Sequence, residues 1–211
     1  MRKPLIHLLL AAALMAGSTA YGQTAIGSGA ALLILVRDTL KNPTNLQANL
    51  QAAIAADPTD AAAITLSFVN AMPLKAAMIV GDVINALPAP SGALTSTVLA
   101  NLVAQVQVTA QTSPQVTALP NAAATKVAIA SAVSGSTPVL NSTIPSATIN
   151  SAVTTLQTPS ALATAVAGTA STVASSKPTN LTALTTAVNT ANSTTNPPIP
   201  AVVVNQVTSP H

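Results

Sequence analysis

The sequence has no cysteine and no tryptophan, and charged residues make up only 5% of its 211 residues. Without cysteine, neither a disulfide framework nor a lipoprotein anchor is available. Aromatic residues are equally scarce, at 1%, so alanine, valine and other small apolar residues must form most of the core. Such a core buries little area per residue, and we expect its stability to come from many short contacts between closely packed backbones.

Side chains that commonly carry catalysis are nearly missing as well. One histidine, His7, belongs to the leader described below, and the other, His211, is the last residue. A Ser-His-Asp triad or a histidine-rich metal site therefore cannot be assembled from the interior of the mature chain. The acidic residues are Asp38, Asp57, Asp60 and Asp82. Because active sites bring several perturbed polar groups into one pocket, we expect no enzyme, no catalytic, metal-binding or cofactor-binding residues, and no cofactor.

Two of these acids have a structural explanation in the sequence. Asp57 and Asp60 are close enough to suggest an acid/base pair or a calcium site. The segment Asp57-Pro58-Thr59-Asp60 also has the order expected at a helix start: an N-cap, a proline at the first helical position and an acid in the first turn. We favour capping. Asp82 and Lys75, two helical turns apart, are expected on a solvated face where they serve solubility.

The first 20 residues have the pattern of a secretory leader. Arg2 and Lys3 form a basic start, residues 5–17 an apolar core, and Ser18-Thr19-Ala20 a small-residue cleavage site. Cleavage up to residue 22 is an alternative. An uncleaved membrane anchor would need about 20 apolar residues, so the apolar core is short for one. The sequence predicts an exported bacterial protein that is periplasmic, cell-surface or secreted.

Removal of this leader leaves almost no net charge. Of the seven basic residues, two are Arg2 and Lys3, which leaves five basic against four acidic residues and a net charge of +1. After Asp82 the only charged side chains are Lys126 and Lys177. Such a chain lacks the basic patch that binding to nucleic acid or to anionic lipid requires. We therefore expect neither a nucleic-acid partner nor a stable membrane anchor after cleavage.

Four prolines, at positions 43, 58, 73 and 88, lie fifteen residues apart and delimit three repeated units over residues 43–87. Counting each proline as position zero, positions three, seven, ten and fourteen are mostly apolar, with Thr65 and Asp57 as exceptions. Steps of four, three and four residues follow one face of a helix. Each unit is thus predicted to be a short helix closed by a turn. A helix of this length is marginal alone, so the units must stack, and two of them would make a helical hairpin.

The remaining segments complete an all-α prediction. Residues 30–40 are apolar nearly all round and are expected to form a buried helix that caps the first repeat, with an interfacial anchor as the alternative. Pro88-Ala89-Pro90-Ser91-Gly92 indicates a loop. We therefore divide the mature chain into a helical region over residues 24–90, a degenerate region over 91–196 and an extended or disordered tail over 197–211.

The region 91–196 is rich in alanine, threonine, serine and valine. Helical stripes run through Leu94, Val98, Leu102 and Val106, through Val127, Ala130 and Val133, and through Ile149, Val153 and Leu156. Prolines 159, 178 and 197 suggest a longer repeat of nineteen residues. Because threonine and valine are poor helix formers, packing as strands is the alternative. The whole chain is then an array of short, proline-punctuated helices, arranged as helical hairpins, a solenoid or an irregular bundle.

The sequence therefore predicts a structural or interaction protein of unspecified role. Its partner would be another exported or cell-surface protein, or a second copy of itself. The alternative is a carrier that holds an apolar small molecule between its helices, because an interior with few large side chains leaves voids to fill. Pull-down or crosslinking tests the first function, and native mass spectrometry for a co-purifying ligand tests the second.

Overall fold

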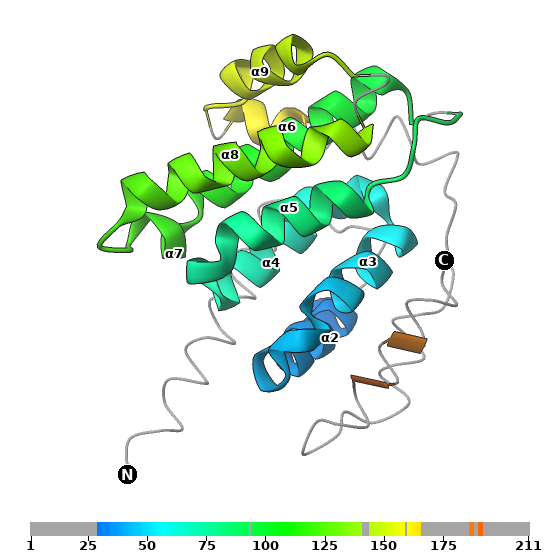
Figure 1. Ribbon diagram of the computed structural model, residues 1–211, viewed down its shortest axis with the longest axis vertical. Helices are drawn as coiled ribbons and strands as arrows, with labels where there is room; N and C mark the ends of the chain where they lie inside the picture. Colours follow the sequence, from blue (N-terminus) through cyan, green and yellow to red (C-terminus); the bar gives the residue numbers. More distant parts are fainter. Residues whose placement is uncertain are drawn as a thin grey trace.

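The computed structural model describes residues 29–92, 94–140, 144–158, 160–165, 186–187 and 190–191. Within them every regular element is a helix (Figure 1), which confirms the all-α prediction. The α-helices are α2 (Gly29–Lys41), α3 (Leu46–Ala56), α4 (Ala61–Ala71), α5 (Ala76–Ala86), α6 (Ser96–Thr112), α7 (Pro114–Thr117), α8 (Ala122–Leu140) and α9 (Ser146–Thr155). The predicted leader, the tail over 197–211 and prolines 159, 178 and 197 lie outside the described residues.

In each of the three units, the opening proline begins a 3-10 turn. An eleven-residue α-helix follows that turn directly. The turns are η1 (Pro43–Asn45), η2 (Pro58–Asp60) and η3 (Pro73–Lys75), and they lead into α3, α4 and α5. Proline suits this place because its fixed φ is helical and its missing N–H would have no partner there. The same backbone hydrogen bond closes all three turns, from Asn45 N, Asp60 N and Lys75 N to the carbonyl oxygen three residues earlier. The repeat predicted from the prolines is confirmed.

Helix α2 is a fourth unit of the same array, which the proline pattern did not reveal. Helices α2, α3, α4 and α5 end at Lys41, Ala56, Ala71 and Ala86, fifteen residues apart. In the sequence, the position of the proline is held by Ser28. Ala31, Ile34 and Leu35 of α2 are fully buried, at the same unit positions as Ala76, Ile79 and Val80 of α5. The predicted helix over residues 30–40 is therefore confirmed, and it belongs to the repeat.

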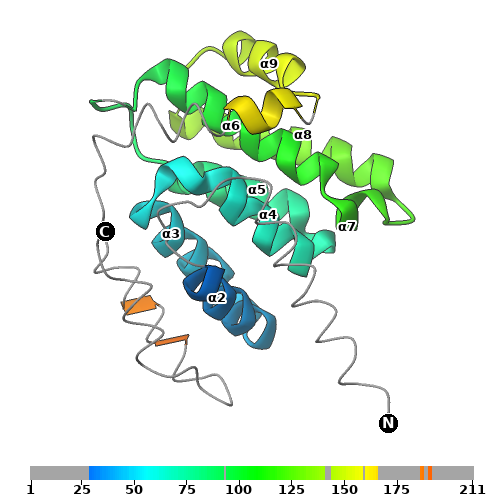
Figure 2. The same ribbon diagram turned by 180° about the vertical axis from the view of Figure 1, so that it is seen from behind.

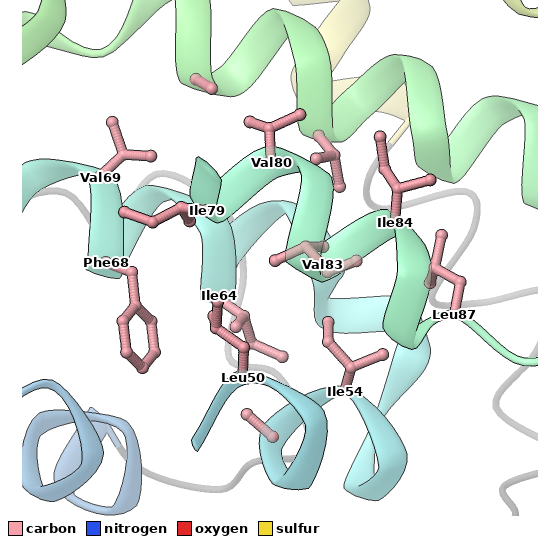
Figure 3. Close-up of a cluster of buried hydrophobic side chains, with 14 of the residues drawn as sticks. Leu50, Ile54, Ile64, Phe68, Val69, Ile79, Val80, Val83, Ile84 and Leu87 are labelled. Carbon is pink, nitrogen blue, oxygen red and sulfur yellow. The ribbon is translucent and has the colours of Figure 1, made fainter. Parts of the chain in front are cut away.

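The core of the array contains three of the four predicted positions in every proline-led unit, together with two more. The fourth predicted position, fourteen, is buried and apolar at Leu87 but is only half-buried at Met72. Positions three, seven and ten are buried in all three proline-led units, and so are positions six and eleven. Figure 3 shows apolar members of this set, such as Leu50 of α3, Ile64 of α4 and Val83 of α5, gathered in one cluster with Phe68 as its largest member. Positions six and eleven are buried as well because other helices cover each helix of the array on two sides. A single contact face would bury only the predicted stripe.

The first two proline-led units turn sharply relative to each other, and neighbours in the chain are not the main packing partners of α3 and α4. The segments Pro43–Ala56 and Pro58–Ala71 are bent by 118° relative to each other. As a result α3 packs more extensively against α5 than against α4, and α4 packs more extensively against α6 than against α5. Figures 1 and 2 show α2 and α3 at one end of the molecule and α8 and α9 at the other. The units form an interlocked array.

The loop predicted after Pro88 separates α5 from α6. It is closed by two reciprocal hydrogen bonds between the backbones of Ser91 and Leu94, of 3.1 and 3.0 Å, and Gly92 adopts a φ of 56° within it. Glycine suits that position because positive φ is unfavourable for residues with a side chain. Helix α6 begins next, where Thr95 Oγ1 accepts from the backbone N–H of Val98.

Every regular element that the structure describes in the second half is a helix. Helix α6 is buried almost throughout from Leu99 to Ala110, since α4, α8 and α9 all pack on it. The predicted stripes of α6 and α9 are largely confirmed, because Leu102, Val106 and Ile149 are buried. The stripe of α8 is wrong at Val127, which is 66% exposed; Ile129 is the buried residue there. A run rich in alanine offers several faces of similar hydrophobicity, so the periodicity did not select one.

Candidate functional site

Asp57 caps the helical segment that it precedes. Its Oδ1 accepts a hydrogen bond of 3.0 Å from Thr59 N and another from the Thr59 hydroxyl, and Asp60 lies in the first turn. This confirms the capping prediction. Both carboxylates are buried, with about 4% of each residue exposed, although charged caps more often face solvent. Asp57 Oδ2 has no hydrogen-bond partner within the described structure.

The first unit makes a related contact, and the third unit has lost it. Thr44 Oγ1 donates to Asn42 Oδ1 over 2.7 Å, as Thr59 does to Asp57. The Asn42 side chain accepts no bond from a backbone N–H, so Asn42 stands at the cap position of the first unit without capping it as Asp57 caps the second. In the third unit the two positions are Met72 and Leu74, which cannot form this pair. The array therefore changes from polar to apolar side chains at this turn.

Leu74 and Met78 stand out from the surface at the start of the third unit. Leu74 is 79% exposed and Met78 is 56% exposed, and they lie four residues apart across η3 and the first turn of α5. The residues at these unit positions are Thr44 and Ala48 in the first unit and Thr59 and Ala63 in the second. Among the three proline-led units, large apolar side chains are therefore exposed only at these two positions of the third unit. We call Leu74 and Met78 the apolar pair.

A second cluster, which the sequence pattern did not indicate, is polar and buried. Asn49 Nδ2 on α3 lies 2.9 Å from Asp38 Oδ2, 3.0 Å from Thr39 Oγ1 and 3.3 Å from the carbonyl oxygen of Leu35, all on α2. Asn45 Nδ2 donates to the same Asp38 oxygen over 2.8 Å. We call Asp38, Thr39, Asn45 and Asn49 the polar lock. Asp38 lies within α2, and its side chain is buried against the first proline-led unit.

Asp82 and Lys75 differ from the solvated pair that the sequence suggested. Both side chains are half-buried. Burial raises the pKa of Asp82 above its ordinary value because desolvation disfavours the charged carboxylate. The expectation of a fully solvated face is therefore too simple.

No group of three or more histidine, cysteine, aspartate or glutamate side chains is placed to hold a metal ion among the described residues. His211 lies outside that part of the chain. No single described helix is long and apolar enough to cross a membrane, although the bent pair Pro43–Ala56 and Pro58–Ala71 together satisfies length and composition.

Comparison with protein-family models, with curated proteins and with solved structures yields no match for this chain.

Proposed function

We propose that this chain is an exported structural or interaction protein, and that the apolar pair Leu74 and Met78 forms part of its contact surface. The observation that supports the proposal is the departure of the third unit from the repeat. Where the first unit places Thr44 and Ala48, the third exposes a leucine and a methionine. A second protein that covers them would remove this apolar area from water.

The local chemistry favours a protein contact. Single exposed apolar residues are ordinary. In the third unit, however, Leu74 stands where the first two units have the threonine of a polar side-chain contact. Together with Met78 it forms an apolar surface that spans about one helical turn. Methionine is also common at adaptable binding surfaces, since its flexible side chain fits partners of varied shape. The half-buried Lys75 beside the pair supplies a cation at its edge.

Export is the second element of the proposal and rests on the leader pattern of residues 1–20. N-terminal sequencing of protein recovered outside the cytoplasm tests it directly. We expect the mature chain to begin between residues 21 and 23. Recovery of a chain that still begins at Met1 would contradict export by this route.

Site-specific photocrosslinking tests the contact surface. A photoreactive residue is introduced at Leu74 or Met78 in the exporting organism, and the matched controls carry it at Thr44 or Ala48, which occupy the same unit positions and are also exposed. We expect one defined adduct from positions 74 and 78, and none from 44 and 48. Equal labelling at all four positions, or none at any, would overturn the proposed surface.

The identity of the adduct separates the kinds of partner. An adduct of twice the chain mass indicates self-association, and a heavier or lighter one indicates another protein. Native mass spectrometry of the same material detects a co-purifying apolar small molecule, which would favour the carrier function instead.

A further inference from the structure

We infer that the polar lock specifies which unit may pack against the face of α2 that carries Asp38 and Thr39, and so fixes the order of the first units of the array. Helix α4 also packs on α2, but the side-chain hydrogen bonds to Asp38 and Thr39 come from α3 and the turn that precedes it. Nearly equivalent units can exchange partners, either along one chain or between two copies. A buried polar contact that only one pair of units can satisfy prevents this, in the way that a single buried polar residue fixes register in coiled coils.

The unit positions show why the pairing is exclusive. Position six is Asn49 in α3, while it is Ile64 in α4 and Ile79 in α5, and all three side chains are buried. An isoleucine facing Asp38 would take away the amide donor and leave the carboxylate less well compensated in an apolar setting. That arrangement is costly because a buried charge needs hydrogen-bonding partners.

The residues that Asn49 meets are equally specific to α2. Asp38 and Thr39 hold unit positions ten and eleven, where α3 has Ala53 and Ile54. If another helix of the array replaced α2, Asn49 would lose two side-chain acceptors. The polar lock therefore disfavours mismatched pairing both when α2 is replaced and when α3 is replaced, and it acts at the interface between these two helices.

The test uses three variants of the full chain. Asn49→Ile gives α3 the residue of the other units. The triple variant Asp38→Ala, Thr39→Ile, Asn49→Ile makes this interface resemble that between α3 and α4. Asn85→Ile places the same change at an exposed position of α5 and is the matched control.

Thermal unfolding gives the first result. We expect Asn49→Ile to lower Tm by at least about 4 °C relative to Asn85→Ile, because it breaks a buried polar contact in a chain of this size. The triple variant should regain most of that loss, since apolar side chains replace the three buried members of the network and the remaining member, Asn45, is only half-buried. If Asn49→Ile lowers Tm no more than Asn85→Ile does, the inference fails.

Distance measurement between spin labels gives the decisive result. Because the chain has no cysteine of its own, the labels attach only at the cysteines that are introduced. Cysteines at exposed Leu40 on α2 and Gln51 on α3 carry the labels. We expect one narrow distance distribution in the wild type and several distances, or an added dimer by mass, in the triple variant. A triple variant that stays monomeric with the wild-type distribution would overturn the inference, even if Asn49→Ile alone does not fold.

Discussion

Gly81 of α5 and Ser136 of α8 lie so close together that a Cβ atom on Gly81 would stand 3.3 Å from Ser136 Oγ. These two helices share the most extensive contact between elements in the described structure. Close backbone approach through small residues is how a core without large side chains gains its dispersion contacts.

Gly81→Leu should therefore destabilise the protein, by about 1 to 3 kcal/mol, because the added side chain has to push α8 away. Gly135→Ala is the control: a Cβ there meets nothing within 4 Å, and alanine should stabilise the helix by about 0.5 to 1 kcal/mol. Urea unfolding of both variants measures the difference. Equal effects from the two substitutions would show that the contact at Gly81 does not limit packing.

Phe68→Ala should be among the most destabilising single substitutions in the first half. Phe68 is fully buried and is the largest fully buried side chain, and its loss should cost about 3 to 5 kcal/mol. Met78→Ala, at an exposed position, should change stability by less than about 0.5 kcal/mol. Chemical denaturation measures both free energies. A small loss of unfolding free energy in Phe68→Ala would mean that the surrounding helices move in to fill the cavity left by the phenyl ring.

Asp57→Ala should lower stability by about 1 kcal/mol, because the backbone N–H of Thr59 loses its acceptor. Asn42→Ala should cost less than about 0.5 kcal/mol, since Asn42 caps no backbone N–H. Asp57→Ser retains an N-cap oxygen and should recover part of the loss. Denaturation midpoints at pH 7 rank the three variants. If Asn42→Ala costs as much as Asp57→Ala, capping is not the source of the effect.

Asp82→Asn should stabilise the protein near neutral pH and have little effect at low pH. The folded-state pKa of Asp82 is raised by burial, so its contribution is fully present below the unfolded pKa and is lost as pH rises through the folded pKa. Asparagine has no charged form and avoids this loss. The effect should be small because the group is only half-buried. Unfolding curves at pH 3 and pH 7 measure the change, and an equal effect at both would contradict it.

Proline spacing and the apolar stripe were sufficient to predict the three short helices, their starting points and most of their buried residues. Two features escaped the same reasoning for physical reasons. Helix α2 has no proline at its start, so the unit was visible only from its end at Lys41 and from its buried residues. The polar lock was hidden because Asn49 and Asp38 lie eleven residues apart on different helices, and a sequence pattern reports no contact between them.

Candidate chemistry was harder to assess than architecture. Capping by Asp57 could be derived from four consecutive residues, because it is a local interaction. The exposure of Leu74 and Met78 could not be derived from the sequence, since leucine and methionine at such spacing normally face a core. Only the neighbours of η3 and α5 in space decide which side of the helix is covered.

The 118° bend between the segments that contain α3 and α4 has a consequence for how the array unfolds. In a chain whose helices touch only their immediate neighbours, one end can fray while the rest persists. Here, loss of α5 would remove a principal partner of α3, and loss of α6 would do the same to α4. We therefore expect that cutting the polypeptide between two units releases no piece that folds alone, and that the helices from α2 to α6 unfold together as one cooperative block.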